Sequence, residues 1–227
     1  MSGEFVRFGP AHLSVLLAIP LLALALAALT KRVPSLRTRV RFVLAISVLT
    51  VEVGWFLALF FHYGVGWRWV LPFRLSDMSI LLTVFVAFTL HQATFDVVYY
   101  WGLTAVPLAM LMPDLLEPFP DPYTIVFFLL HGLVVAILLY LVWSGTLRPG
   151  AHSAVRSFLA LNAFMLLVLG VNFALGTNYM YLMQKPEQPS LLDYFGPWPV
   201  YLLTSEAVAA MLFGLLGLPF RRQAGGH

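Results

Sequence analysis

Long apolar runs separated by short polar breaks make up most of the chain. Seven of these runs have the length of a membrane-spanning helix, at residues 11–30, 41–61, 72–90, 95–112, 124–143, 155–175 and 199–219. A bilayer core of about 30 Å requires about 20 mostly apolar residues in a helix. The runs are continuous and lack the period-two alternation of strands in a membrane β-barrel. The pattern therefore predicts an all-α membrane protein, a bundle of seven transmembrane helices that forms a single domain over residues 1–227.

The composition supports this fold class. Hydrophobic residues make up 61% of the 227 residues and charged residues only 10%, whereas a soluble domain has about 45–50% apolar and about 25% charged residues. The chain has no cysteine, which excludes disulfides, thiolate-bound metals and a catalytic thiol. Its net charge of +3 fits a basic bias in cytoplasmic loops, so we expect no nucleic-acid partner.

The basic residues also predict the orientation of the chain. If the N-terminus lies outside, nine of the 13 basic residues fall in cytoplasmic segments: Lys31, Arg32, Arg37, Arg39, Arg41, Arg148, Arg156, Arg221 and Arg222. Cytoplasmic loops of membrane proteins carry an excess of Lys and Arg. We therefore expect the N-terminus outside and the C-terminus in the cytoplasm, which an odd number of membrane crossings requires.

A few ionisable residues interrupt the apolar runs, and they are Glu52, Arg74, Asp77, His131 and Glu206. Each costs about 2.5 kcal/mol or more in the hydrocarbon, so such residues point to function. When depth is counted at about 1.5 Å per residue from the segment ends, these groups and Asn172 all fall in the outer half of the bilayer. We therefore expect a shared polar cavity that opens toward the outer leaflet or the exterior.

Each of these residues also has a structural interpretation. Arg74 and Asp77 are three residues apart, so they can neutralise each other on one helix face. The two glutamates can be buried in the protonated form or can pair with Arg74. His131 can be a packed histidine, and Asn172 can hydrogen-bond between helices.

Three kinds of chemistry fit these residue types. In acyl transfer, Ser76 attacks a lipid ester, His131 takes its proton, Asp77 or another of the acids orients the imidazole, and Arg74 stabilises the oxyanion. A metal site is not expected, because only one of the six histidines lies well inside an apolar run. No other cofactor is expected either. A transporter is a weaker alternative, because the sequence has no inverted repeat or pair of broken helices.

Several strings of residues resemble one family. They are Leu71-Pro72-Phe73-Arg74-Leu75-Ser76-Asp77, Tyr100-Trp101-Gly102, Phe119-Pro120-Asp121-Pro122-Tyr123, His131-Gly132, Gly176-Thr177-Asn178-Tyr179-Met180-Tyr181-Leu182 and Gly196-Pro197-Trp198-Pro199. Together they are similar to the YwaF-like bacterial integral membrane proteins, which are related to the eukaryotic transmembrane protein 164. The resemblance extends from about residue 8 to 220.

The resemblance implies a multi-pass protein of the bacterial plasma (inner) membrane. The eukaryotic relative resembles a phospholipid acyltransferase with a Cys/His pair, which implies a membrane lipid or another fatty-acyl ester as the partner. His131 falls on the matching histidine, whereas Ser76 replaces the usual cysteine. A serine is the poorer nucleophile without a strong base, so Ser76 either has stronger activation or marks a lost activity. The alternative function is non-enzymatic binding or sensing of a lipid or small molecule.

The longest loop, from Gly176 to Pro199, completes the candidate site. A loop of this length within a compact domain is usually functional, and we expect it to form a lid over the polar cavity. The candidate catalytic residues are thus Ser76, His131 and Asp77. The candidate substrate-binding residues are Arg74, Glu52, Glu206, Asn172, Asn178 and Tyr179.

Overall fold

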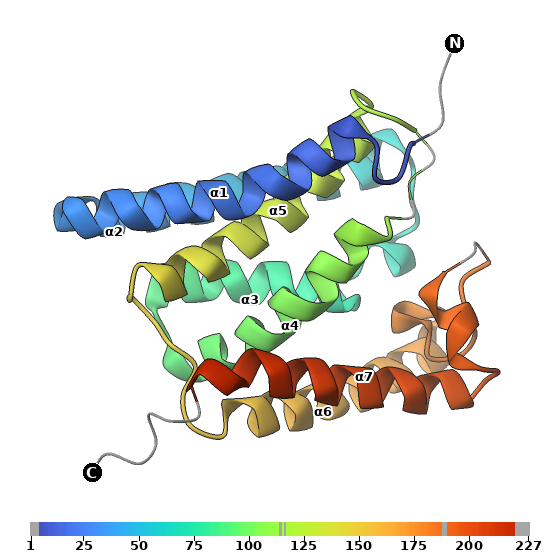
Figure 1. The fold of residues 1–227 in the computed structure, drawn as a ribbon. Helices are drawn as coiled ribbons and strands as arrows, with labels where there is room; N and C mark the ends of the chain where they lie inside the picture. The colour runs from blue at the N-terminus through green and yellow to red at the C-terminus, as the bar shows by residue number, and fades with distance from the viewer. Residues whose placement is uncertain (1–4, 114, 116, 188–189, 221–227) are drawn as a thin grey trace.

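The computed structural model of the protein describes residues 5–113, 115, 117–187 and 190–220, and within them it contains helices and no strand (Figure 1). The α-helices are α1 (Pro10–Arg32), α2 (Arg37–Leu57), α3 (Leu75–Thr89), α4 (Gln92–Leu111), α5 (Pro122–Trp143), α6 (Ser153–Leu175) and α7 (Val200–Gly217). The predicted all-helical fold is therefore confirmed.

Six helical segments of the described chain are long and apolar enough to cross a membrane, and α3 is not one of them. It has 15 residues, which give a length of about 22 Å. The expected run 72–90 is longer, but the helix begins only at Leu75, because Arg74 before it has an extended backbone. At the other end, Leu90 ends the helix in the left-handed conformation, with φ of 56°. A multi-pass protein is thus confirmed, while the number of seven crossings and the orientation of the termini stay predictions.

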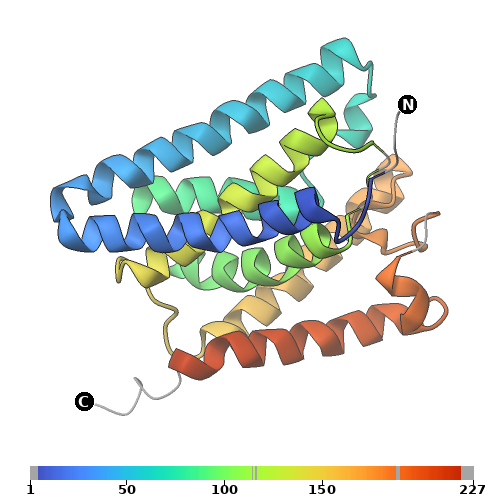
Figure 2. The same ribbon diagram turned by 45° about the horizontal axis from the view of Figure 1, so that its top comes forward.

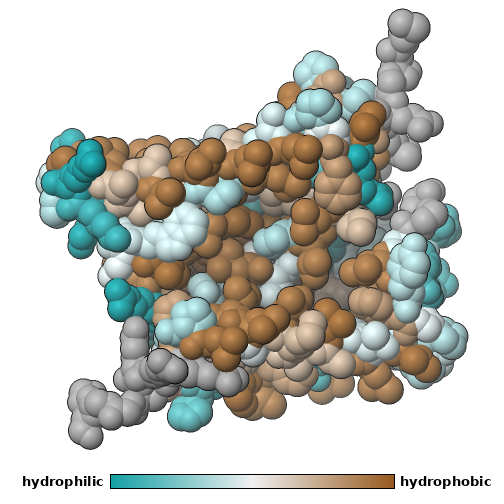
Figure 3. Space-filling model, viewed as in Figure 1, coloured by the Kyte–Doolittle hydropathy of each residue, from teal (hydrophilic) through white to brown (hydrophobic). Residues whose placement is uncertain are grey.

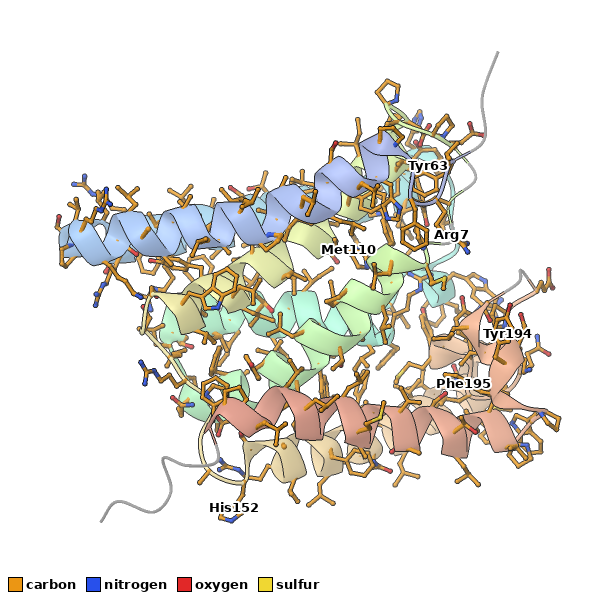
Figure 4. The ribbon with its side chains drawn as sticks, viewed as in Figure 1. Arg7, Tyr63, Met110, His152, Tyr194 and Phe195 are labelled. Carbon is orange, nitrogen blue, oxygen red and sulfur yellow. The ribbon has the colours of Figure 1, made fainter. Side chains whose placement is uncertain are left out.

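The helices run alternately between the two ends of the molecule (Figures 1 and 2). Helix α4 is central and contacts α3, α5, α6 and α7, while α1 packs mainly on α5 and α2 packs on α3 and α5. One end, which we call the long-loop end, carries the short helices η3 (Trp67–Trp69), η4 (Tyr179–Tyr181) and η5 (Leu191–Phe195). The other, the basic end, carries the α1–α2 turn and the α5–α6 loop. Figure 4 places Tyr63 and Tyr194 at the first end and His152 at the second.

The outer surface between these ends is apolar. Leu17, Leu166 and Leu203 are more than 60% exposed, and Figure 3 shows that hydrophobic residues predominate between two more hydrophilic ends. A soluble protein rarely exposes so continuous an apolar surface. A lipid bilayer is the environment that would cover it.

Candidate functional site

The start of α3 carries the first group of candidate residues. Arg74 is the last residue before the helix and has an extended backbone. Its Nη1 atom lies 3.8 Å from Oδ2 of Asp77, one turn later, while the side chains are 59% and 21% exposed. An ion pair this long and this exposed contributes little stability. The guanidinium therefore remains available to other groups.

Glu52 of α2 joins this pair. It lies close enough to both Asp77 and Arg74 to interact electrostatically with each. The side chain of Ser76 interacts with the Asp77 carboxylate. We call this group of two carboxyl groups and one guanidinium the acid–arginine cluster. It lies at the long-loop end and consists of Glu52, Arg74 and Asp77.

Tyr179 brings the long loop to this cluster. Its hydroxyl donates to the carbonyl oxygen of Arg68 at 2.7 Å and accepts from the N–H of Leu71 at 3.1 Å. Its ring contacts Phe73 edge to face, and its phenol interacts electrostatically with Arg74 and Asp77. Burial raises the pKa of the Tyr179 phenol above its ordinary value, so both hydrogen bonds persist at neutral pH.

Asn172 holds Tyr179 in place from the end of α6. Its Nδ2 donates to the Tyr179 carbonyl at 3.0 Å. Its Oδ1 accepts from the Tyr179 N–H at 2.8 Å and from the Thr177 hydroxyl at 2.9 Å. The amide is buried and all these bonds are within one segment. The geometry therefore gives Asn172 a positioning role for the loop.

The rest of the long loop is fixed by its own hydrogen bonds. Asn178 donates to the Gln184 carbonyl and accepts from the N–H groups of Met183 and Gln184. The indole of Trp198 donates to Leu182 O at 3.2 Å, and the hydroxyl of Tyr201 donates to Tyr181 O. These bonds fold the loop over the long-loop end, next to the acid–arginine cluster.

His131 lies on α5 and does not interact with the residues of the acid–arginine cluster in the described structure. Its Nδ1 hydrogen-bonds the carbonyl oxygen of Phe127 at 2.8 Å, and its ring stacks on the Phe127 ring with centroids 4.2 Å apart. Within the described ranges, no hydrogen bond or ion pair connects it to Ser76 or to a carboxylate. Its neighbours Phe128 and Gly132 face α1, at His12 and Ile19 respectively.

Glu206 has its hydrogen-bond partner on α6. Its Oε2 accepts from Nδ2 of Asn162 at 2.8 Å, which joins α7 to α6. Asn162 also donates to the Phe158 carbonyl of its own helix. The structure therefore brings Glu52, Arg74, Asp77, Ser76 and Tyr179 together and places Glu206 in a separate α6–α7 contact.

Two buried polar groups were missed from the sequence. Asp96, 3% exposed, accepts from Arg156 at 2.6 Å, Gln92 at 2.7 Å and the Gly150 N–H at 3.0 Å. His12, 1% exposed, accepts from the N–H of Phe8 and bonds Met110 O. Both residues lie in the first turn of an apolar run. A polar residue is common at that position, where a run ends in a loop, so the hydropathy pattern did not indicate that these two are buried.

The described residues contain no group of three or more His, Asp or Glu side chains that could hold a metal ion. Two hollows of about 300 and 290 Å³ lie on the other side of the molecule, at the basic end. The chemistry available at and beside the acid–arginine cluster is that of two carboxylates, the guanidinium of Arg74, the hydroxyl of Ser76 and the phenol of Tyr179.

Comparison with known proteins agrees with the resemblance noted from the sequence strings. The model of the TMEM164 family matches residues 7–217, which covers all seven α-helices completely. No curated protein and no solved structure matches the chain. The match includes every residue of the acid–arginine cluster, the long loop and His131. The chain belongs to the TMEM164 family.

Proposed function

We propose that the protein transfers or hydrolyses a fatty-acyl ester of a membrane lipid, with Ser76 as nucleophile and His131 as base, and with Asp77 next to Ser76. The observation that carries this proposal is the hydrogen bond from His131 to Phe127 O. A carbonyl oxygen only accepts, so Nδ1 must carry a proton. In the neutral imidazole Nε2 then has the free lone pair that a general base needs.

The position of Ser76 supports the same chemistry. Ser76, Ile80, Thr83 and Ala87 follow each other at helical spacing, and the last three are buried, so Ser76 begins the face of α3 that packs into the bundle. Its hydroxyl interacts with Asp77 and, among the described residues, forms no hydrogen bond with His131. Catalytic hydrogen bonds often form only when substrate is bound.

The surroundings of Ser76 favour an amphiphilic substrate. Arg74 presents a largely exposed guanidinium, which suits a phosphate headgroup or a developing oxyanion. The apolar outer surface lets the acyl chain stay in the bilayer while the ester reaches the polar site. Membership of the TMEM164 family adds support, since the eukaryotic relative resembles a phospholipid acyltransferase.

A fluorophosphonate probe tests the nucleophile. We expect the purified protein to be labelled, Ser76→Ala to abolish labelling and His131→Ala to slow it by about 100-fold or more, the usual contribution of a general base. Ser79→Ala is the matched control, because Ser79 lies on the same helix and bonds only Leu75 O. Labelling that persists in Ser76→Ala would contradict the assignment. Release of fatty acid from a fluorogenic acyl ester should follow the same order.

A second candidate is non-enzymatic binding of a lipid or small molecule at the acid–arginine cluster. The close approach of Glu52 to Asp77 and Arg74 favours it, because such a cluster can recognise a headgroup that carries both charges. In this case the protein shows neither labelling nor ester cleavage, while Glu52→Gln and Arg74→Gln weaken ligand binding. Ester cleavage that depends on Ser76 would decide in favour of the enzyme.

A further inference from the structure

A basic cavity lies at the opposite end of the molecule from the acid–arginine cluster. It has a volume of about 300 Å³ and is lined by the start of α2, with Arg37, Thr38 and Arg41, and by the end of α5, with Tyr140 and Thr146. Its walls thus present two guanidinium groups and the hydroxyl of Thr38, while the hydroxyls of Tyr140 and Thr146 already bond Arg37 O and the Ser144 hydroxyl. The guanidinium groups suit an anion, since each carries several N–H donors.

The charges around this cavity are not balanced by the protein. The first turn of α2 has no acidic residue and no side-chain cap, yet Arg37, Arg39 and Arg41 follow one another there. Cations are unfavourable at a helix N-terminus, whereas anions are favoured. Among the described residues, none of these arginines forms an ion pair with a carboxylate.

The two cavity arginines also have N–H groups that form no hydrogen bond within the described residues. Arg37 donates from Nε to the carbonyl oxygen of Thr30 at 3.3 Å, which holds its guanidinium at the cavity. Arg41 has its guanidinium 5.1 Å from the centroid of the Phe42 ring. The Nη groups of both side chains have no partner in the described part of the chain, so they are free to form the paired bonds that phosphate prefers.

An apolar hollow at the same end indicates that such a phosphate belongs to a lipid. This hollow of about 290 Å³ is lined by Leu24, Ala27, Ala28 and Lys31 of α1 and by Trp143 of α5. Trp143 is one turn from Tyr140 of the basic cavity, so both hollows share the end of α5. Trp and Lys at the border of an apolar surface are typical of the membrane–water interface.

We propose that the basic cavity binds the phosphate of an anionic membrane lipid, whose acyl chain lies along the apolar hollow. This site is separate from the proposed acyl-ester site, and neither depends on the other. The ligand is recognised by its phosphate, and the adjoining apolar hollow favours a lipid over free phosphate.

Native mass spectrometry of the full chain tests the proposal with phosphatidylglycerol, phosphatidylcholine and inorganic phosphate as probes. We expect phosphatidylglycerol to bind and to raise the thermal unfolding temperature, with little effect of the other two. The variant Arg37→Gln/Arg41→Gln should bind phosphatidylglycerol about 25-fold more weakly, at about fivefold per arginine near a membrane surface.

The control variant is Arg32→Gln/Arg39→Gln, which removes the same charge from the same turn but from residues outside the cavity. It should retain most of the affinity. Equal losses in both variants would overturn the cavity as the site and leave only a general surface charge. Stabilisation by inorganic phosphate as strong as that by phosphatidylglycerol would overturn the lipid as ligand. Helical circular dichroism checks that each variant is folded.

Discussion

Polar side chains in this protein form most of their hydrogen bonds with backbone groups. Asn172 binds both the N–H and the carbonyl of Tyr179, and Tyr179 in turn binds the backbone at Arg68 and Leu71. Two loops that are far apart in sequence are joined in this way. One buried amide therefore positions the loop that brings Tyr179 to the acid–arginine cluster.

Replacing this amide should release the loop. We expect Asn172→Ala to lower the free energy of unfolding by about 2 kcal/mol, because it leaves buried backbone groups without partners. Hydrogen exchange should become faster at residues 177–182. Asn162→Ala is the control on the same helix, since it removes the bond to Glu206 and should leave exchange in the loop unchanged. Unchanged exchange in Asn172→Ala would contradict the positioning role.

Asp96 has a comparable role at the basic end. Its carboxylate joins the start of α4 to Arg156 and to the backbone at Gly150. We expect Asp96→Ala to destabilise the protein by about 3 kcal/mol, because the partners of a buried charge lose their hydrogen bonds. Thermal unfolding in detergent measures the effect. A loss as small as that of Asp193→Ala, whose ion pair with Lys185 is long and partly exposed, would be inconsistent with this role.

Residue depth could be predicted from the sequence, but helix rotation could not. Counting from segment ends placed Glu52, Asp77 and Glu206 at a similar depth, and the first two do meet. Glu206 instead faces Asn162, because α7 packs on α6 rather than on α2. The helices of this bundle have apolar residues on all sides, so the sequence gives no periodic signal of which face points inward.

Packing between elements depends on small residues where helices cross. A Cβ atom at Gly102 of α4 would lie 2.4 Å from Cδ1 of Leu138 on α5. Leu138 is completely buried, so its side chain has little room to move. Glycine at this position therefore sets how closely the central helix approaches α5, as small residues commonly do in membrane bundles.

Two glycine substitutions should separate packing from helix propensity. We expect Gly102→Ala to destabilise the protein by about 1–3 kcal/mol through overpacking. Gly170→Ala, at a helical site with no neighbour within 4 Å of the added Cβ, should stabilise it by up to about 1 kcal/mol. Unfolding of both variants followed by tryptophan fluorescence measures the difference. A similar stability for the two variants would show that the α4–α5 crossing tolerates a methyl group.

Helices could be predicted from the sequence where an apolar run is helical over its whole length. Six of the seven expected runs are helices of spanning length. The exception is the run 72–90, where the apolar residues before Leu75 form an irregular segment. Hydropathy measures the preference for lipid and not the backbone conformation, so it could not predict the extended backbone at Arg74 or the left-handed end at Leu90.

The molecule as a whole has two chemically different ends. The basic residues of the α1–α2 turn and the α5–α6 loop share one end, and the acid–arginine cluster and long loop share the other. The expected orientation, in which the basic end is cytoplasmic, rests on these same basic residues and stays a prediction. The proposed ester chemistry would then face the outer leaflet of the bilayer.

Cysteine labelling tests the orientation without background, because the chain has no cysteine. Tyr194 is 86% exposed at the long-loop end, and Ser35 is exposed in the α1–α2 turn. In intact cells, a membrane-impermeant maleimide should label Tyr194→Cys and should label Ser35→Cys only after permeabilisation. The reverse pattern would invert the orientation and place the cluster on the cytoplasmic side.

The shortness of α3 has a consequence for the lipid around it. Helix α3 is about 8 Å shorter than the hydrocarbon core. It is followed at the basic end by α4, whose first residue, Gln92, donates a hydrogen bond to Arg148 O. The missing length therefore falls at the long-loop end. Leu81 and Phe85 are exposed on α3, so we expect the adjacent leaflet to thin if α3 makes the predicted crossing, at a modest cost per ångström of mismatch. Such thinning would bring water and lipid headgroups to the level of Arg74, and we expect short-chain lipids to be enriched beside it.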